Sequence, residues 1–194
     1  YLQDERIHFI ELDFSSEEKL KKQLQSYSFN YVVHAAGATK CTKRDDFFRI
    51  NTQGTQHFVN ALLALNMPIE RFVFISSLSV YGAIHEQLPY KDIDETDIPQ
   101  PNTAYGESKL KAEKVLANTS YNGKTLPYVI LRPTGVYGPR EKDYFLMAKS
   151  IKGHIDFSVG FQRQDITFIY VKDLVQAVFL AIDKAKIGRA YFLT

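Results

Sequence analysis

The sequence has 194 residues, of which 45% are hydrophobic and 24% are charged, and its 24 basic and 22 acidic side chains leave a formal net charge of +2. This composition is typical of one folded domain, and because the basic residues are scattered among acids we expect no nucleic-acid partner. No run of about 18 apolar residues predicts a membrane span, and no leader pattern predicts a signal peptide. The single Cys41 excludes an internal disulfide and fits a reducing compartment, which predicts a cytoplasmic protein.

Short apolar runs alternate with amphipathic stretches along the chain, a pattern typical of a parallel sheet covered by helices on both faces. No repeat or long linker supports two independent domains. In chain order the predicted elements are a strand at 7–12, a helix opening at a capping box in 15–18, a strand at 31–35, a helix at 45–66 ended by Pro68, a strand at 72–75, a helix from 105 through 116 capped by Asn102 or Thr103, strands at 128–131 and 167–170, and a helix from 173 to about 184.

Two of these helices have a clear apolar side. The first should bury Leu20, Leu24 and Tyr27 against the sheet. The helix at 45–66 carries small and apolar residues at helical spacing, which we expect to face the core: Phe47, Ile50, Gly54, Phe58, Ala61 and Leu65.

Tyr105 and Lys109 stand four residues apart on a predicted helix, so both side chains leave the same helical face. An unperturbed tyrosine titrates near pH ~10, and a phenol that exchanges protons near neutrality needs a fixed positive charge beside it. Lys109 could supply that charge. Taken alone the spacing is common, and an incidental surface pair explains it equally well.

Small and hydroxyl-bearing residues follow two predicted strands. The segment 76–82 places serines just past a strand's carboxyl end, where ligands sit in open α/β sheets, and Ser77 is the best candidate to touch a substrate oxygen. The segment 34–37, His-Ala-Ala-Gly, lets a flat ligand approach the backbone closely. Turn formation is the alternative explanation for both segments.

Together these features resemble one family, the extended short-chain dehydrogenase/reductases, also called the NAD-dependent epimerase/dehydratase family. The resemblance covers nearly the whole chain, because its motifs occur in the family's order. They are Asp13, His34 to Gly37, Asn51 with Gly54-Thr55, Ser76-Ser77 through Gly82, Tyr105 to Lys109, Arg132-Pro133 through Arg140, and Tyr170-Val171 with Asp173.

The resemblance implies a catalytic group of Ser77, Tyr105 and Lys109. Tyr105 would donate or accept the proton of a substrate carbinol or carbonyl, and Ser77 would hydrogen-bond the same oxygen. Lys109 would hold the nicotinamide ribose and depress the pKa of Tyr105. Besides Tyr105 and Lys109, the implied contacts to an NAD or NADP cofactor are Asp13 (at the adenine), Phe14, Ala35, Ala36, Gly37, Asn51, Ile75, Ser76, Pro133 and Val136.

Substrate contacts are suggested at Thr39, Ser79, Thr134, Arg140 and Arg163. The five histidines show no close ligand spacing, so we expect no metal site, and hydride transfer would not need one.

One part of the family pattern is missing. The chain contains no G-x-G-x-x-G turn to receive a dinucleotide pyrophosphate, so we expect an internal fragment of a doubly wound, Rossmann-like parallel sheet that is incomplete at the N-terminus. Residues 1–135 would form a partial dinucleotide-binding domain. Residues 136–194 would add part of the substrate-binding region and the last strand and helix, within one structural unit. The choice between NAD and NADP stays open.

Three departures from the family narrow the substrate. Sugar-nucleotide dehydratases carry an Asp-Glu pair where this chain has Leu78 and Ser79, which disfavours dehydration. Sugar-nucleotide epimerases carry an Asn at Gly135 and an Arg-Asp pair at 166–167, here Ile-Thr, and Arg163 could replace that Arg from upstream. These positions look more like ketone reductases and hydroxysteroid-dehydrogenase-like members than like UDP-galactose epimerases.

The function expected from the resemblance is reversible hydride transfer at a secondary alcohol or ketone carbon of a small molecule, for net reduction or for epimerisation. One alternative is a nucleotide-sugar epimerase of the UDP-galactose 4-epimerase type. An alternative of another class is a non-catalytic dinucleotide sensor or structural subunit, although such members usually lose the Tyr or the Lys. A homodimer is one state that the resemblance suggests, and Phe47, Phe48 and Phe58 are compatible with it.

Overall fold

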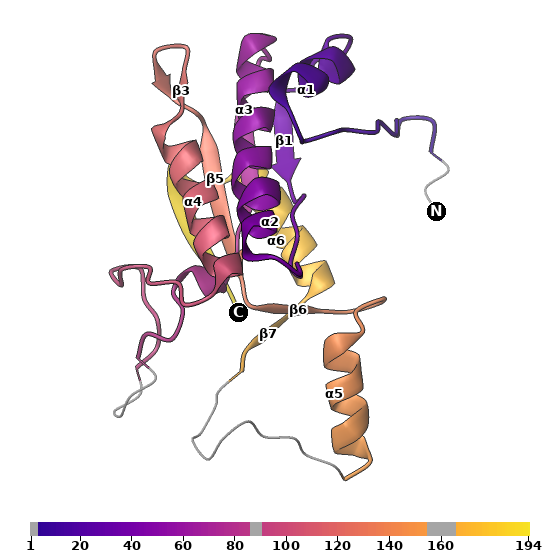
Figure 1. Cartoon of the computed structure of the whole chain (residues 1–194), viewed down its shortest axis with the longest axis vertical. Coiled ribbons are helices and arrows are strands. Elements are labelled where there is room, and N and C mark those ends of the chain that lie inside the picture. The colour runs from indigo at the N-terminus through magenta and orange to yellow at the C-terminus, as the bar shows by residue number, and fades with distance from the viewer. Residues whose placement is uncertain (1–3, 86–90, 155–165) are drawn as a thin grey trace.

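The computed structural model describes residues 4–85, 91–154 and 166–194. Within these residues a parallel four-stranded sheet forms the centre of the molecule (Figure 1). Across the sheet, the strands are β1 (Tyr31–His34), β2 (Arg71–Ile75), β5 (Tyr128–Pro133) and β8 (Arg189–Leu193).

The helices are α1 (Glu17–Leu24), α2 (Arg44–Phe47), the π-helix η1 (Phe48–Gln53), α3 (Gly54–Ala64), the 3₁₀ helix η2 (Leu78–Val80), α4 (Ala104–Asn118), α5 (Asp143–Lys152) and α6 (Val171–Asp183). None of the helices in the described ranges is long and apolar enough to cross a membrane. Two short ladders complete the fold: β3 (Ser120–Tyr121) with β4 (Lys124–Thr125), antiparallel, and β6 (Gly135–Tyr137) with β7 (Phe168–Tyr170), parallel.

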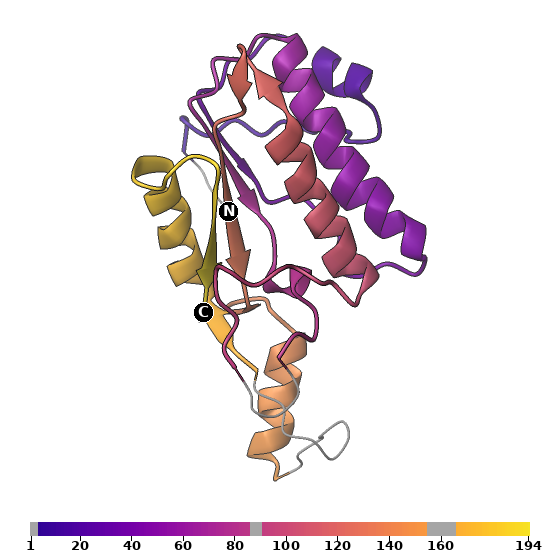
Figure 2. The same cartoon turned by 90° about the vertical axis from the view of Figure 1, so that its left-hand side faces the viewer.

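Helices cover both faces of the sheet, which confirms the predicted doubly wound, Rossmann-like architecture (Figure 2). Along β2, Phe72 and Phe74 point into the layer under α1, α3 and α4, whereas Val73 points toward α6. All three are fully buried, because a parallel sheet covered on both sides needs apolar residues at successive positions. α5 and the β6–β7 ladder lie beyond the end of the sheet, away from α1 (Figure 1).

Matched register brings the carboxyl ends of neighbouring strands to one edge of the sheet. His34 pairs with Phe74, Phe74 with Ile130, and Ile130 with Ala190. The segments that follow β1, β2 and β5 therefore leave the sheet side by side, where ligands bind in open α/β sheets.

The predicted helix at 45–66 forms, but it contains the π-helix η1 between α2 and α3. A π turn holds one more residue than an α turn, so it rotates the following side chains around the axis. As a result Asn51 is 1% exposed and faces inward, while Ile50, predicted to be buried, is 37% exposed. Phe58 and Ala61 are buried as predicted.

Two predictions at the N-terminal end are wrong. Residues 7–12 form no strand, because none of the described strands pairs with them, and Phe9 is 80% exposed. α1 ends at Leu24, so Tyr27 lies beyond it, 42% exposed and stacked on Phe29. The helix cap is also shifted by one residue, since Ser16 accepts from the Lys19 amide.

Gly106 allows α4 to lie directly on the η2 turn. A Cβ at this position would be 2.2 Å from the Ser79 carbonyl oxygen, which is far inside van der Waals contact. The N-terminal turn of α4 is thereby pressed against the segment that follows β2, and Gly106 immediately follows Tyr105 in the chain.

We expect Gly106→Ala to destabilise the protein by about 1–3 kcal/mol or more, because the methyl group must displace backbone. Gly54→Ala is the matched control, since its Cβ would be 3.4 Å from the nearest atom outside its own turn and alanine is the better helix former by about 1 kcal/mol. Urea unfolding of both variants measures the difference. Equal stabilities would contradict the close packing described for Gly106.

Candidate active site

Lys109 occupies the centre of the candidate site and is 5% exposed. Its ammonium donates to the Ile75 carbonyl oxygen at 2.6 Å and lies over the Phe74 ring, 4.2 Å from the ring centre. Burial lowers the pKa of Lys109 to about 8, and the nearby Glu113 carboxylate opposes that shift. The lysine therefore joins α4 to the end of β2 by a charge-assisted hydrogen bond.

Tyr105 lies one turn before Lys109, in the first turn of α4. The helix is capped by Thr103, whose hydroxyl accepts from the Gly106 amide at 3.0 Å. The Tyr105 ring meets Phe47 edge to face at 6.2 Å, and its phenol hydrogen-bonds Ser77. The sequence-predicted trio of Ser77, Tyr105 and Lys109 thus gathers where β2 and α4 meet.

The expected electrostatic effect on Tyr105 does not occur in this arrangement. Burial raises the pKa of Tyr105 above its ordinary value, and the hydrogen bond from Ser77 offsets only part of that rise. Lys109 makes no contribution to this shift in the present arrangement, in which its ammonium donates to the Ile75 carbonyl oxygen. The phenol is therefore protonated near neutral pH.

Ser77 is held in place by the turn that it caps. Its hydroxyl oxygen accepts from the Ser79 amide at 3.1 Å, and the hydroxyl lies 3.1 Å from the Ser79 Oγ. Ser76 is buried, and its hydroxyl donates to the Glu113 carboxylate at 2.5 Å. Adjacent serines therefore have different surroundings, one half-buried beside Tyr105 and one in the interior.

The loop after β1 offers small, exposed residues to the same edge. Ala35, Ala36 and Gly37 are exposed. Asn51 fixes this loop by two hydrogen bonds to Ala38. Its side chain accepts from the Ala38 amide at 2.7 Å and donates to the Ala38 carbonyl at 3.0 Å. Bare backbone in this position fits the approach of a flat ligand.

Asn51 also connects this loop to α4. Its amide lies 2.9 Å from the Ser108 hydroxyl, next to Lys109 in the chain, and Ser108 in turn donates to the Tyr105 carbonyl. A Cβ on Gly37 would come within 3.0 Å of the Asn51 oxygen and 3.9 Å of the Lys109 ammonium. The π-helix thus places a buried amide between the loop and the catalytic candidates.

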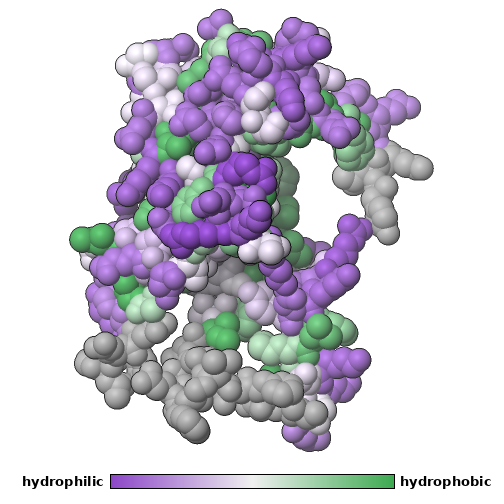
Figure 3. Space-filling model, in the orientation of Figure 1, coloured by the Kyte–Doolittle hydropathy of each residue, from purple (hydrophilic) through white to green (hydrophobic). Residues whose placement is uncertain are grey.

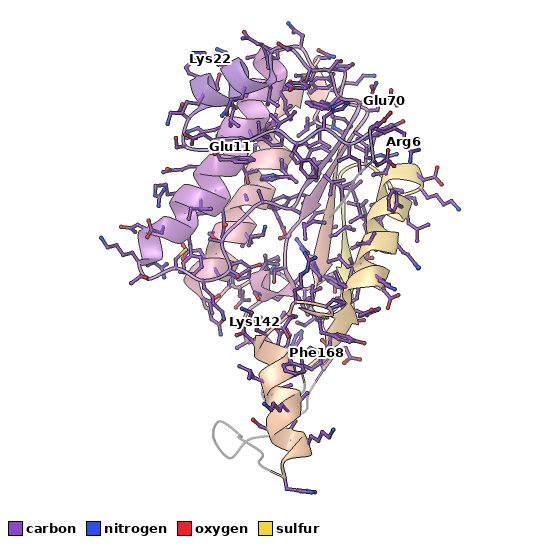
Figure 4. The ribbon with its side chains drawn as sticks, turned by 90° about the vertical axis from the view of Figure 1, so that its right-hand side faces the viewer. Arg6, Glu11, Lys22, Glu70, Lys142 and Phe168 are labelled. Atoms are coloured by element: carbon purple, nitrogen blue, oxygen red, sulfur yellow. The ribbon has the colours of Figure 1, made fainter. Side chains whose placement is uncertain are left out.

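Tyr144, on α5, was not predicted from the sequence. Its hydroxyl lies 2.8 Å from where a Cβ on Gly135 would be, and its ring packs edge to face on Phe168 at 4.8 Å. Its charge interaction also contributes to the raised pKa of Tyr105. The space left at Gly135 is therefore filled by a phenol from another element, and only the tertiary fold reveals it. Figure 4 marks Phe168 where the sheet body meets α5.

Three cofactor candidates lie in other surroundings. The Asp13 carboxylate accepts from Lys19 at 2.7 Å in the turn before α1, which lowers the pKa of Asp13. Phe14 packs in the core, stacked on His34. Val136 is half-buried in β6.

The remaining candidates lie around the end of the sheet. Pro133 ends β5, and Thr134 bonds through both its amide and hydroxyl to the Leu193 carbonyl. Thr39 is exposed between Ala38 and Lys40. Arg140 has a positive φ of 77° in the turn before α5. Arg163 falls outside the described residues.

His34 is buried among aromatic rings at the end of β1. It is 4% exposed, stacks on Phe74, and lies 2.9 Å from the Thr55 hydroxyl. Because Thr55 donates its own proton to the Asn51 carbonyl at 2.7 Å, it must accept from His34, so Nε2 of the imidazole carries the proton. Burial and the charge of Lys109 lower the pKa of His34 to about 3.

Comparisons with known proteins find relatives that match nearly the whole chain. The family model of the NAD dependent epimerase/dehydratase family matches residues 1–193. Mouse dTDP-D-glucose 4,6-dehydratase is 29% identical over 94% of this chain and 52% of its own length. The decarboxylating sterol-4-alpha-carboxylate 3-dehydrogenase of Schizosaccharomyces pombe is 25% identical over 94% and 54%. RMD from Pseudomonas aeruginosa, complexed with NADPH, superposes with a TM-score of 0.77 at 26% identity, over 94% of this chain and 64% of that one. The chain thus spans about half the length of the curated relatives it matches.

His34 should make stability depend on pH. Its folded pKa of about 3 lies below its ordinary value of 6.5, so the unfolded chain binds the extra proton between these values. The free energy of unfolding is therefore unaffected by the titration of His34 above pH 6.5. It falls from pH 6.5 toward pH 3, with a slope of up to about 1.4 kcal/mol per pH unit. We expect His34→Gln to flatten this part of the curve.

Urea unfolding from pH 8 to pH 4 measures the effect. The difference at pH 8, where His34 is neutral in both states, reports lost packing alone. Curves for wild type and variant that stay parallel down to pH 4 would contradict the buried neutral imidazole.

Proposed function

The chain belongs to the NAD dependent epimerase/dehydratase family, and on this premise we propose that it carries the proton-transfer group of an NAD(P)-dependent enzyme that moves a hydride at a secondary alcohol or ketone carbon. The observation that carries the proposal is the hydrogen-bonded pair of Tyr105 and Ser77 one helical turn from a buried Lys109. Positioned acids and bases of this kind are what carbonyl reduction requires of a protein.

Tyr105 is the proposed acid and base. In the observed state its phenol is protonated, so it can donate a proton to a carbonyl oxygen as that oxygen gains negative charge. Ser77, half-buried beside it, donates a second hydrogen bond to the same oxygen. In the reverse direction Tyr105 must accept the alcohol proton, and a Lys109 ammonium turned from the Ile75 carbonyl toward the phenol would stabilise the phenolate.

The cofactor is proposed to lie against Ala35 to Gly37, beside Lys109. Exposed small residues and a buried amine 3.9 Å from the Gly37 Cβ position fit a nicotinamide ribose at this edge. NAD or NADP would accept or supply the hydride. Ile75, Ser76, Pro133 and Val136 would border it, Asn51 would support the loop from beneath, and Asp13 and Phe14 would serve the adenine end. RMD, whose structure is complexed with NADPH, and the NAD dependent family of this chain together support a dinucleotide of either form.

The substrate is proposed to be a ketone or secondary alcohol without a strongly charged group near the reacting carbon. The rings of Tyr144 and Phe168 pack edge to face and fill the space beside Gly135, where the epimerases carry a polar amide. Thr39, Ser79, Thr134, Arg140 and Arg163 stay as candidate substrate contacts. Leu78 and Ser79 supply no carboxylate after Ser77, which argues against water elimination.

A nucleotide-sugar epimerase is the second candidate. It is favoured by the similarity to an enzyme named for dTDP-D-glucose. Thermal unfolding separates the two, because a nucleoside diphosphate that binds the folded protein raises the melting temperature by an amount that grows with its concentration relative to its dissociation constant. A non-catalytic sensor is less favoured because Ser77, Tyr105 and Lys109 are all present and adjacent.

A homodimer and a cytoplasmic location are also proposals. The outer faces of α3 and α4 enclose a groove of about 440 Å³ with largely polar walls. Phe48, predicted as a contact, lies under Arg44 and Lys111 beside it, whereas Phe58 is in the core. Analytical ultracentrifugation would decide whether the protein is a monomer or a dimer.

In Figure 3 hydrophilic side chains dominate the surface over the sheet and its helices, whereas hydrophobic side chains are exposed around α5.

Tyr105→Phe is the direct test of the proposed chemistry. The variant keeps the ring packed on Phe47 but loses the exchangeable proton, so nicotinamide-coupled turnover should fall by about 100-fold or more. Cofactor affinity should change little. Absorbance of the reduced nicotinamide measures turnover, and titration measures affinity.

Tyr31→Phe is the control, because this tyrosine is exposed and its hydroxyl donates to Glu70. It should leave turnover unchanged. A Tyr105→Phe protein as active as wild type would rule out Tyr105 as the acid. Failure of any alcohol, ketone or nucleotide sugar to react with the wild type would favour the sensor.

A further inference from the structure

Glu113 and Arg132 form a buried charge pair one helical turn beyond Lys109. Their side chains are 5% and 12% exposed. The guanidinium donates twice to the carboxylate, from Nη2 at 2.6 Å and from Nε at 3.1 Å. Such a forked pair fixes the relative orientation of both groups as well as their separation.

The remaining polar atoms of the pair are also bonded. Glu113 accepts from the buried Ser76 hydroxyl at 2.5 Å, and Arg132 donates to the Tyr81 hydroxyl at 2.7 Å. Tyr81 is 1% exposed and packs edge to face on Phe192 at 5.4 Å. An ion pair in the interior seldom stabilises a fold more than apolar residues of the same size would, so this network calls for a role besides stability.

The pair ties together the three elements that build the candidate site. Glu113 comes from α4, Ser76 follows β2, and Arg132 lies in β5. Ser76 stands between Ile75, which accepts from Lys109, and Ser77, which meets Tyr105. Fixing Ser76 to α4 therefore fixes both neighbours relative to the helix that carries the tyrosine and the lysine.

Glu113 also sets the field at Lys109. The titratable and charged groups on the elements around this lysine are Tyr105 and Glu113 on its own helix, His34 at the end of β1 and Arg132 in β5, and of these Glu113 and His34 interact with its charge. His34 is neutral, and Tyr105 is protonated. Glu113 is thus the negative charge that opposes the cost of burying the ammonium, and it acts from the next turn of the helix.

We propose that Glu113, held by Arg132, is a positioning residue that keeps Lys109 in its ammonium form and aligns Ser77 with Tyr105. The inference rests on the proposed function for its catalytic meaning. Its electrostatic part concerns Lys109 alone and can be measured without substrate.

The test is the titration of Lys109 in Glu113→Gln, followed by heteronuclear NMR of labelled lysine side chains and assigned with Lys109→Arg. Glutamine keeps the shape but removes the negative charge and leaves the Arg132 cation uncompensated. We expect the midpoint to fall by about one pH unit or more. In Glu113→Gln, the pH above which hydride transfer declines should lie below the wild-type value by the same amount, because the reaction needs the charged lysine.

Glu107→Gln is the matched control, since this glutamate is on the same helix but pairs with Arg44 and Lys111 near the surface. It should not move the midpoint. The double variant Glu113→Gln/Arg132→Met removes both charges, so its midpoint should lie between those of the wild type and Glu113→Gln, and it serves alone if the single variant does not fold.

A folded Glu113→Gln protein, or the double variant, with an unshifted Lys109 midpoint would overturn the inference, because a purely structural role changes stability without changing the titration. A wild type that titrates as expected but transfers no hydride would count against the proposed function and leave the inference standing.

Discussion

Lys109 carries an ammonium group into the layer between the sheet and α4, where a charge is tolerated only if the surroundings compensate for lost water. Two contacts do so, with the Ile75 carbonyl and with the face of the Phe74 ring, and the charge of the Glu113 carboxylate on the same helix assists them. Both contacts require a particular distance between helix and sheet. The absence of a side chain at Gly106 permits that distance, and the buried amide of Asn51 links the helix to the loop after β1. The arrangement of the candidate site therefore depends on the contacts that allow the Lys109 ammonium to be buried.

Much of the fold could be predicted from the sequence, because most of its helices and strands have a recognisable local pattern of apolar residues. β2 reads as a continuous apolar run, and the period of 3.6 residues marks α4 and α6. Residues 7–12 show the limit of this approach: an apolar run predicts a strand, but a strand needs a neighbour to pair with. The strand predicted at 167–170 forms as β7, but α5 and β6 escaped prediction, since the apolar residues of α5, including Phe145 and Leu146, do not follow a one-sided pattern of burial.

The candidate site was predictable to the extent that its residues follow strand ends or share a helix face. Ser77, Tyr105 and Lys109 do, and they meet in the structure. The direction of the Tyr105 pKa shift was not predictable, because it depends on burial and on where the Lys109 ammonium points. Tyr144 was missed for a similar reason, since its relation to Gly135 spans two elements that only tertiary packing brings together.

The π-helix between α2 and α3 limits how this chain can change in length. The residues on either side of this π-helix contact different partners. Phe47, before it, contacts Tyr105, and Thr55, after it, hydrogen-bonds His34. Straightening residues 48–53 into an ordinary α-helix without removing a residue would rotate one half against the other by about 100°. Either the aromatic support of the tyrosine or the partner of the buried imidazole would then be lost. The number of residues in this helix and the π turn are therefore coupled, because the active-site edge and the core keep their partners together only while the turn absorbs the extra residue.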